Sequence, residues 1–249
     1  MNATTHIEEI IEKAAELRRK EKFEEALDLL ETLYQTYPNI KEVKNALIET
    51  LFTYGGYLND ELILEYEKAR ELFERIIRMD PTNYRAYYNL GIANFNLTNI
   101  EKAKECYEVA IKIKPDYKHC FYNIGLIYEE EGNLQEALNY YEKALEIDPR
   151  FPYAFNARVQ ILKNLEALKK SQKISNRQEK TEKLKSLLEV SKRIKIGMLQ
   201  SLLDVNNDRL LEILIEWCKK YQFELDGDFL NLNKDSIPKL IKDIENLEI

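Results

Sequence analysis

The stretch that decides the fold is PDYKHCFYNIGLIYEEEGNLQEALNYYEKALEIDP, residues 115–149. It begins and ends with a proline, and another proline, Pro81, precedes it by the same interval. The two intervals are equal, because 115 − 81 = 34 and 149 − 115 = 34. A sequence that repeats every 34 residues predicts pairs of helices that stack along one axis.

The side chains between these prolines repeat with the same period. The recurring positions hold Phe121, Ile124, Gly125, Tyr128, Gly132, Ala137, Tyr141 and Ala144 in one repeat, and Tyr87, Leu90, Gly91, Ala103, Tyr107 and Ala110 in the one before. We expect the small residues to lie where two helices cross closely and the aromatic ones to fill the gap to the next repeat. Each proline follows a helix that it cannot continue. One hairpin cannot bury its own apolar face, so the repeats must stack.

This pattern resembles the tetratricopeptide-repeat (TPR) family, and the resemblance covers about residues 7–168. It implies a mainly α fold, with an α-solenoid of about four repeats and a closing helix over residues 152–168. It also implies a right-handed superhelix with a concave groove that binds an extended peptide or a partner's helix. Members of the family are scaffolds and adaptors far more often than enzymes. The first domain is therefore predicted to span residues 1–168.

Two weaker repeats come earlier in the chain. They are marked by Ala26, Leu30 and Pro38, and by Ala69, Phe73 and Pro81. The second is nine residues longer than the others, because 81 − 38 = 43 and 43 − 34 = 9. The pair Gly55-Gly56 predicts a break in its first helix, with Asn59 or Asp60 capping the next. That next helix is expected to run from about Glu61 to Met79 and to overhang the stack.

The concave groove is the candidate site. The resemblance implies that the second, fifth, sixth and ninth residues of each first helix line it. These residues are Arg85, Tyr88, Asn89, Ile92, His119, Tyr122, Asn123, Leu126, Tyr153 and Asn156. An asparagine can pair with a peptide backbone without reading its sequence, and the arrangement resembles the asparagine ladder of some TPR adaptors. The alternative is that Asn89 and Asn123 make only local contacts with their own helices.

Another known TPR site is a clamp of Lys, Asn and Arg that grips the C-terminal carboxylate of a chaperone. The sixth-place asparagines match that pattern. The basic partners do not, because His119, Tyr153 and Ala157 stand where lysine or arginine is needed. The resemblance therefore does not imply carboxylate capture for this chain.

Composition and motifs argue against catalysis. Neither of the two histidines, His6 and His119, has a cysteine or carboxylate at metal-ligand spacing. No phosphate-binding or nucleophile motif is present, so we expect no enzyme, no metal and no cofactor. The three cysteines are odd in number and widely spaced, which indicates reduced thiols. No apolar run is long enough for a membrane span. We expect a soluble, cytoplasmic protein.

Residues 169–185, KKSQKISNRQEKTEKLK, hold seven basic and two acidic side chains. Few of these residues are apolar, which predicts a solvated basic linker in which a helix begins near Glu179. The alternative is a contact with nucleic acid or with an acidic partner. The chain as a whole carries a net charge of −7. Neither flanking region has the basic excess typical of a nucleic-acid binder.

Residues 186–249 change in character. They predict a short strand at Arg193–Ile196, a short helix at Met198–Leu203, a helix that Asp208 caps and that runs to about Tyr221, and an Asp-Gly hairpin over 223–232. The apolar stripe of the longer helix is expected to hold Leu210, Leu211, Leu214, Trp217, Cys218 and Tyr221. This order predicts a small winged-helix α+β domain. Over about residues 188–232 it resembles the winged helix of the PCI family, whose members are scaffold subunits of large complexes.

The exposed faces of this domain favour protein over nucleic acid as its partner. The outer face of the helix over 208–221 is expected to carry Arg209, Glu212, Glu216, Lys219 and Lys220, and the wing carries Glu224, Asp226 and Asp228. Phosphates would repel these carboxylates. The sequence therefore predicts a protein-interaction adaptor or scaffold with a peptide-binding groove and a second assembly module. The alternative is a peptide-sensing regulator whose winged helix binds nucleic acid.

Overall fold

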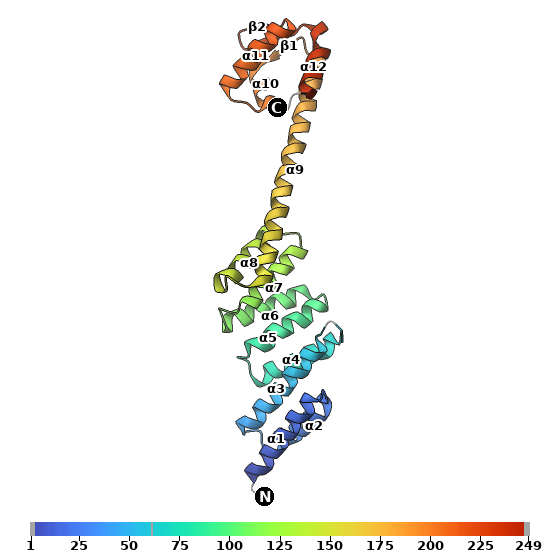
Figure 1. The fold of residues 1–249 in the computed structure, drawn as a ribbon, viewed down its shortest axis with the longest axis vertical. Coiled ribbons are helices and arrows are strands. Elements are labelled where there is room, and N and C mark those ends of the chain that lie inside the picture. The colour runs from blue at the N-terminus through green and yellow to red at the C-terminus, as the bar shows by residue number, and fades with distance from the viewer. Residues whose placement is uncertain (1–2, 61, 247–249) are drawn as a thin grey trace. The chain divides into compact units, whose positions relative to one another are not determined.

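The computed structural model describes residues 3–60 and 62–246, which Figure 1 traces from the N-terminus to the C-terminus. The chain divides into two compact units, residues 1–163 and residues 164–249. Each unit buries apolar side chains of its own. The two units are therefore described one after the other.

The first unit is a series of helical hairpins in which each helix from α1 to α7 packs on the next one (Figure 1). The helices are α1 (Ala3–Arg19), α2 (Phe23–Thr36), α3 (Lys41–Leu58), α4 (Tyr66–Met79), α5 (Tyr84–Asn96), α6 (Ile100–Ile113), α7 (Lys118–Glu130), α8 (Leu134–Ile147) and the first turns of α9 (Pro152–Val190). This confirms the mainly helical, solenoid-like architecture.

Three consecutive repeats bury the same positions of their second helix. These positions hold Ala69, Phe73 and Ile76, then Ala103, Tyr107 and Ala110, then Ala137, Tyr141 and Ala144, all at most 1% exposed. The facing glycines leave room for the aromatic rings. A Cβ atom on Gly91 would lie 2.4 Å from the Tyr107 ring, and one on Gly125 would lie 2.6 Å from the Tyr141 ring. The predicted close crossing of helices at these glycines is confirmed.

The long second repeat differs from the prediction. The glycine pair does not break the first helix, because α3 continues through Gly55 and Gly56 to Leu58. A Cβ atom on Gly55 would lie 2.9 Å from the ring of Phe73. Gly55 is therefore the close-crossing glycine of this repeat, and it has no role in ending the helix.

This equivalence shows where the nine extra residues lie. Gly55 comes 55 − 38 = 17 residues after Pro38, whereas Gly91 comes 91 − 81 = 10 residues after Pro81. Seven extra residues therefore precede Gly55, and they lengthen the part of α3 before this glycine by about two turns. The other two lie between Gly55 and α4. The second helix is not elongated, since α4 begins at Tyr66. Residue 61, where its start was expected, lies outside the described residues.

The second unit contains the end of α9 and a small sheet with helices. Its further elements are β1 (Arg193–Lys195), α10 (Ile196–Leu203), α11 (Asn207–Tyr221), β2 (Glu224–Asp226), β3 (Phe229–Asn231), a 3-10 turn η1 (Lys234–Ser236) and α12 (Ile237–Asn246). The strands are antiparallel in the order β1-β3-β2, so that Leu230 pairs with both Ile194 and Leu225. The predicted order of strand, two helices and hairpin is present.

The apolar stripe of α11 is narrower than predicted. Leu210, Leu214, Trp217 and Tyr221 are buried. Leu211 is instead 54% exposed, and Cys218 is half-buried. The cap also differs from the prediction, since the side chain of Asn206, and not that of Asp208, accepts a hydrogen bond from the backbone N–H of Arg209.

Helix α9 continues without a break through residues 169–185, where the sequence predicted a linker with a helix starting only near Glu179. Exposed ion pairs one turn apart support this polar helix. They are Lys170–Glu166 at 2.9 Å, Lys183–Glu179 at 2.6 Å and Lys185–Glu182 at 2.9 Å. Leu184 is only 2% exposed and belongs to the second core. That core therefore begins before residue 186.

Candidate peptide-binding site

Aromatic side chains from α5, from α7 and its preceding turn, and from the start of α9 form one continuous array. Ring centroids are 5.1 Å apart for Tyr88 and Tyr117, 5.2 Å for Tyr117 and His119, 5.0 Å for His119 and Phe151, 5.6 Å for Phe151 and Tyr122, and 5.8 Å for Tyr122 and Tyr153. Four of the residues predicted to line the groove, Tyr88, His119, Tyr122 and Tyr153, are thereby brought together. The tilted and edge-on contacts are those that aromatic pairs prefer.

Two members of the array, Tyr117 and Phe151, were missed by sequence reasoning. Each stands two residues after a repeat proline, and they are separated by 151 − 117 = 34 residues. Phe151 links His119 to Tyr122, and Tyr117 contacts both Tyr88 and His119, whose ring centroids also lie 6.0 Å apart. The 34-residue spacing of these two aromatic residues could therefore have revealed them, although they lie in the turns between repeats.

The two predicted asparagines donate side-chain hydrogen bonds within the first unit. Asn89 donates through its Nδ2 atom to the backbone oxygen of Arg85 at 2.8 Å. Asn123 donates through Nδ2 to the hydroxyl oxygen of Tyr107 at 3.3 Å. The Asn89 bond stays within its own helix, as the alternative expected, whereas the Asn123 bond joins α7 to α6. Neither Oδ1 atom has a hydrogen-bond partner among the residues that the structure describes.

The remaining predicted residues surround the array in different ways. The guanidinium carbon of Arg85 lies 4.6 Å from the centre of the Phe52 ring on α3, a cation–π distance. Ile92 and Leu126 are half-buried on α5 and α7. Asn156 is exposed on α9, and no hydrogen bond joins it to another described residue.

Burial favours the neutral forms of two members of the aromatic array. Burial, followed by the nearby Tyr117, raises the pKa of the Tyr88 hydroxyl far above its usual value. Burial, followed by the charge of Lys118, lowers the pKa of His119 below its usual value. Lys118 itself forms an ion pair with Asp148.

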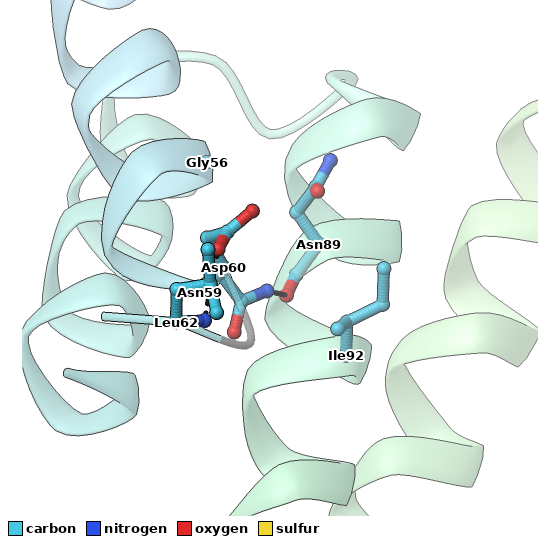
Figure 2. Close-up of a pocket in the computed structure, with 6 residues that line it drawn as sticks. All are labelled: Gly56, Asn59, Asp60, Leu62, Asn89 and Ile92. Atoms are coloured by element: carbon cyan, nitrogen blue, oxygen red, sulfur yellow. Dashed lines mark hydrogen bonds between the residues drawn. The ribbon is translucent and has the colours of Figure 1, made fainter. Parts of the chain in front are cut away.

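A cavity of about 520 Å³ lies beside the predicted residues on α5 (Figure 2). It is lined by Gly56, Asn59, Asp60, Leu62, Asn89 and Ile92. Asn59 reaches across from the end of α3 and donates through Nδ2 to the backbone oxygen of Asn89 at 3.4 Å. Its Oδ1 atom is buried and accepts no hydrogen bond within the described chain. The loop after the lengthened α3 thus borders two residues of the candidate site.

No group of three His, Cys, Asp or Glu side chains within 3–60 and 62–246 is placed to hold a metal ion. Burial raises the pKa of Cys106 to about 11 and that of Cys120 to about 12. Both thiols are therefore protonated at neutral pH and are weak nucleophiles.

Among the helices of the described chain, none combines the length and the apolar character that crossing a bilayer demands.

Comparison with known proteins identifies the repeats. Models of the tetratricopeptide repeat match residues 84–117 and residues 120–151. A crystal structure of the MamA protein is 26% identical, with 68% of this chain and 93% of that chain covered and a TM-score of 0.50. A second MamA crystal structure is 27% identical, with 65% and 96% covered and a TM-score of 0.48.

A third structure, the first TPR of Spaghetti (RPAP3) bound to the HSP90 peptide SRMEEVD, is 23% identical, with 48% and 93% covered and a TM-score of 0.44. No curated protein matches the chain. The two matched stretches coincide with the helical pairs α5–α6 and α7–α8. Residues 84–117 and 120–151 are therefore tetratricopeptide repeats.

Proposed function

We propose that this protein is an interaction adaptor that binds an extended peptide over the aromatic and asparagine side chains of α5, α7 and the start of α9. The observation that carries the proposal is the continuous array through Tyr88, His119, Tyr122 and Tyr153. Tyr153 is 64% exposed, so the array presents this ring openly to a partner, while Tyr88, His119 and Tyr122 are half-buried beside it. Exposed aromatic surface of this kind is typical of binding sites.

The asparagines supply the polar part of the proposed site. Nδ2 of Asn89 and of Asn123 donates within the chain, and each Oδ1 atom can accept a hydrogen bond from a peptide N–H. The two residues are separated by 123 − 89 = 34 positions and therefore occupy the same place on successive first helices. A row of equal acceptors fits a repeating backbone and does not select a particular sequence.

The second unit is proposed to be a winged-helix-like assembly module, related to that of PCI scaffold subunits, that contacts protein. The exposed face of α11 supports this choice. Arg209 lies 2.7 Å from Glu212, and Lys220 lies 2.9 Å from Asp243. Glu216 is exposed on the same helix. Cations that are already paired with carboxylates neutralise few phosphates, so the nucleic-acid alternative is disfavoured.

The test is affinity capture of partners from native lysate with the intact chain and with the double variant Asn89→Ala and Asn123→Ala. Loss of an amide that pairs with a buried peptide group costs about 1–3 kcal/mol, or roughly tenfold or more in affinity. We expect the double variant to lose the captured partner. Its melting temperature should fall only slightly, because alanine is a good helix former and each substitution removes a single side-chain hydrogen bond.

Asn139→Ala is the matched control, because Asn139 is exposed on α8 outside the array. This variant should capture the partner as the parent chain does. A large drop in the melting temperature of the double variant would show that the asparagines hold the helices together. Undiminished capture by a well-folded double variant would exclude them from the binding surface.

A further inference from the structure

The second unit contains a groove of about 810 Å³ that follows one face of α9 and is bordered by α10, α11's preceding turn and α12. Its rim carries Lys169, Lys173 and Lys180, and its floor includes Leu202, Val205 and Ile244. We propose that this groove binds an acidic amphipathic helix of a partner protein. The inference does not depend on the peptide site of the first unit, because the groove shares no residue with it.

The charge of the groove's rim indicates that the ligand is negatively charged. The groove also includes Glu179 and Asp204, but each is neutralised by its own lysine. Lys183 lies 2.6 Å from Glu179, and Lys180 lies 2.9 Å from Asp204. Lys169 and Lys173 have no ion-pair partner among the described residues, and both are exposed. The groove therefore presents an uncompensated positive charge at the end formed by α9.

The apolar floor identifies the kind of ligand. Leu202 and Val205 are half-buried and border the groove together with the buried Leu184 and Ile244. No aromatic ring lines the groove in the described part of the chain, so nucleotide bases would have nothing to stack on. An amphipathic helix places apolar side chains in a hydrophobic groove and keeps its polar face outside. The aliphatic floor and the basic rim together complement a helix that carries leucines on one face and carboxylates beside that face.

The length of the groove sets the length of the helix. The residues of α9 that line it extend from Lys169 to Leu184. At 1.5 Å per residue this distance is about 22 Å, or roughly four helical turns. A partner helix of about 15 residues, with apolar side chains at intervals of three and four, would cover the groove.

The experiment uses a fluorescein-labelled peptide of about 15 residues, with leucines on one helical face and glutamates beside it, titrated against the intact chain by fluorescence anisotropy. We expect saturable binding that weakens as salt is raised. The double variant Lys169→Glu and Lys173→Glu should bind the peptide at least about tenfold more weakly, since attraction becomes repulsion. Both lysines are exposed, so the variant should remain folded, which circular dichroism would verify.

The control variant Lys112→Glu and Lys163→Glu changes the net charge by the same amount at exposed positions outside the groove, and should bind as the parent does. Equal loss in both variants would overturn the proposal. Equal binding of a scrambled peptide of the same composition would also overturn it, because the apolar face would then play no part. A labelled duplex of about 15 base pairs that bound more tightly, and depended on the same two lysines, would assign the groove to nucleic acid.

Discussion

Thr98 adopts a backbone conformation that its side chain disfavours. Its φ angle is +61°, in the left-handed region. The equivalent position of the next repeat, 98 + 34 = 132, is Gly132 with a φ angle of +76°. The two residues make the same hydrogen bond, from the Thr98 N–H to the oxygen of Phe95 and from the Gly132 N–H to the oxygen of Glu129. The turn thus requires a left-handed residue, and a β-branched one is strained there.

Replacing Thr98 with glycine should therefore stabilise the first unit. The relief of strain exceeds the entropy cost of glycine by about 0.5–1 kcal/mol, which corresponds to a rise of roughly 1–4 °C in the melting temperature. Thr98→Ala is the control, because alanine keeps the Cβ atom and should gain less. Gly132→Thr should shift the melting temperature downward. A glycine variant that melts below the parent would disprove the strain at Thr98.

The candidate site could be predicted in part because its residues follow the helical places of the repeat. Tyr88, His119, Tyr122 and Tyr153 lie in one array, as expected from their positions on successive first helices. Tyr117 and Phe151 were not predicted because each lies immediately before a helix. The groove positions were counted along the helices, so residues in the turns were left out. The Nδ2 bonds of Asn89 and Asn123 depend on neighbours that only the folded chain defines.

At the scale of elements, α3 shows why a glycine pair is an unreliable indicator of a helix end. In isolation a Gly55-Gly56 pair indicates a helix end, since glycine lowers helix stability by up to about 1 kcal/mol relative to alanine. In the fold, the packing of Phe73 against Gly55 outweighs that cost. Helix α9 shows the opposite error. Its polar, charged middle was predicted to be a linker because it lacks apolar residues at helical spacing. Ion pairs between side chains one turn apart can support an exposed helix without such residues.

Substitution by alanine can distinguish a glycine that is needed for packing from one that is not. Gly91→Ala should destabilise the first unit by about 1–3 kcal/mol, because the new Cβ atom would lie 2.4 Å from the Tyr107 ring. Gly56→Ala should instead stabilise it by up to about 1 kcal/mol, because Gly56 is exposed within α3 and nothing lies within 4 Å of the added atom.

Chemical denaturation followed by circular dichroism would measure both effects on the intact chain. Gly56→Ala also serves as the control for the change of residue type. If both variants were equally destabilised, the close approach of the Tyr107 ring would not be the cause, and the assignment of Gly91 as a packing residue would fail.

At the scale of the whole molecule, the two units have separate cores, and we predict that each folds by itself. Leu184 decides where the second one must begin, because it is 2% exposed in that core. A fragment over residues 176–249 should melt cooperatively. A fragment over 186–249 lacks Leu184 and should be less stable by about 2–5 kcal/mol, the cost of removing a buried leucine. Residues 1–168 should melt as a second independent fragment.

Calorimetry of the fragments and of the intact chain would test this division. In the intact chain, Leu184→Ala should lower one transition and leave the other in place. If that variant lowered a single transition that involves all residues, the two units would fold as one cooperative body.

The seven residues that lengthen α3 limit how this helix can vary in length. Seven residues advance the helix by nearly two full turns and leave its azimuth changed by only about 20°. Gly55 therefore still faces Phe73 although the helix before it is longer. One residue more or fewer would rotate Gly55 by about 100° and turn its bare face away from the ring. The part of α3 before Gly55 can therefore change in length by about seven residues, which is close to two whole turns. It cannot change by a single residue without turning Gly55 away from Phe73.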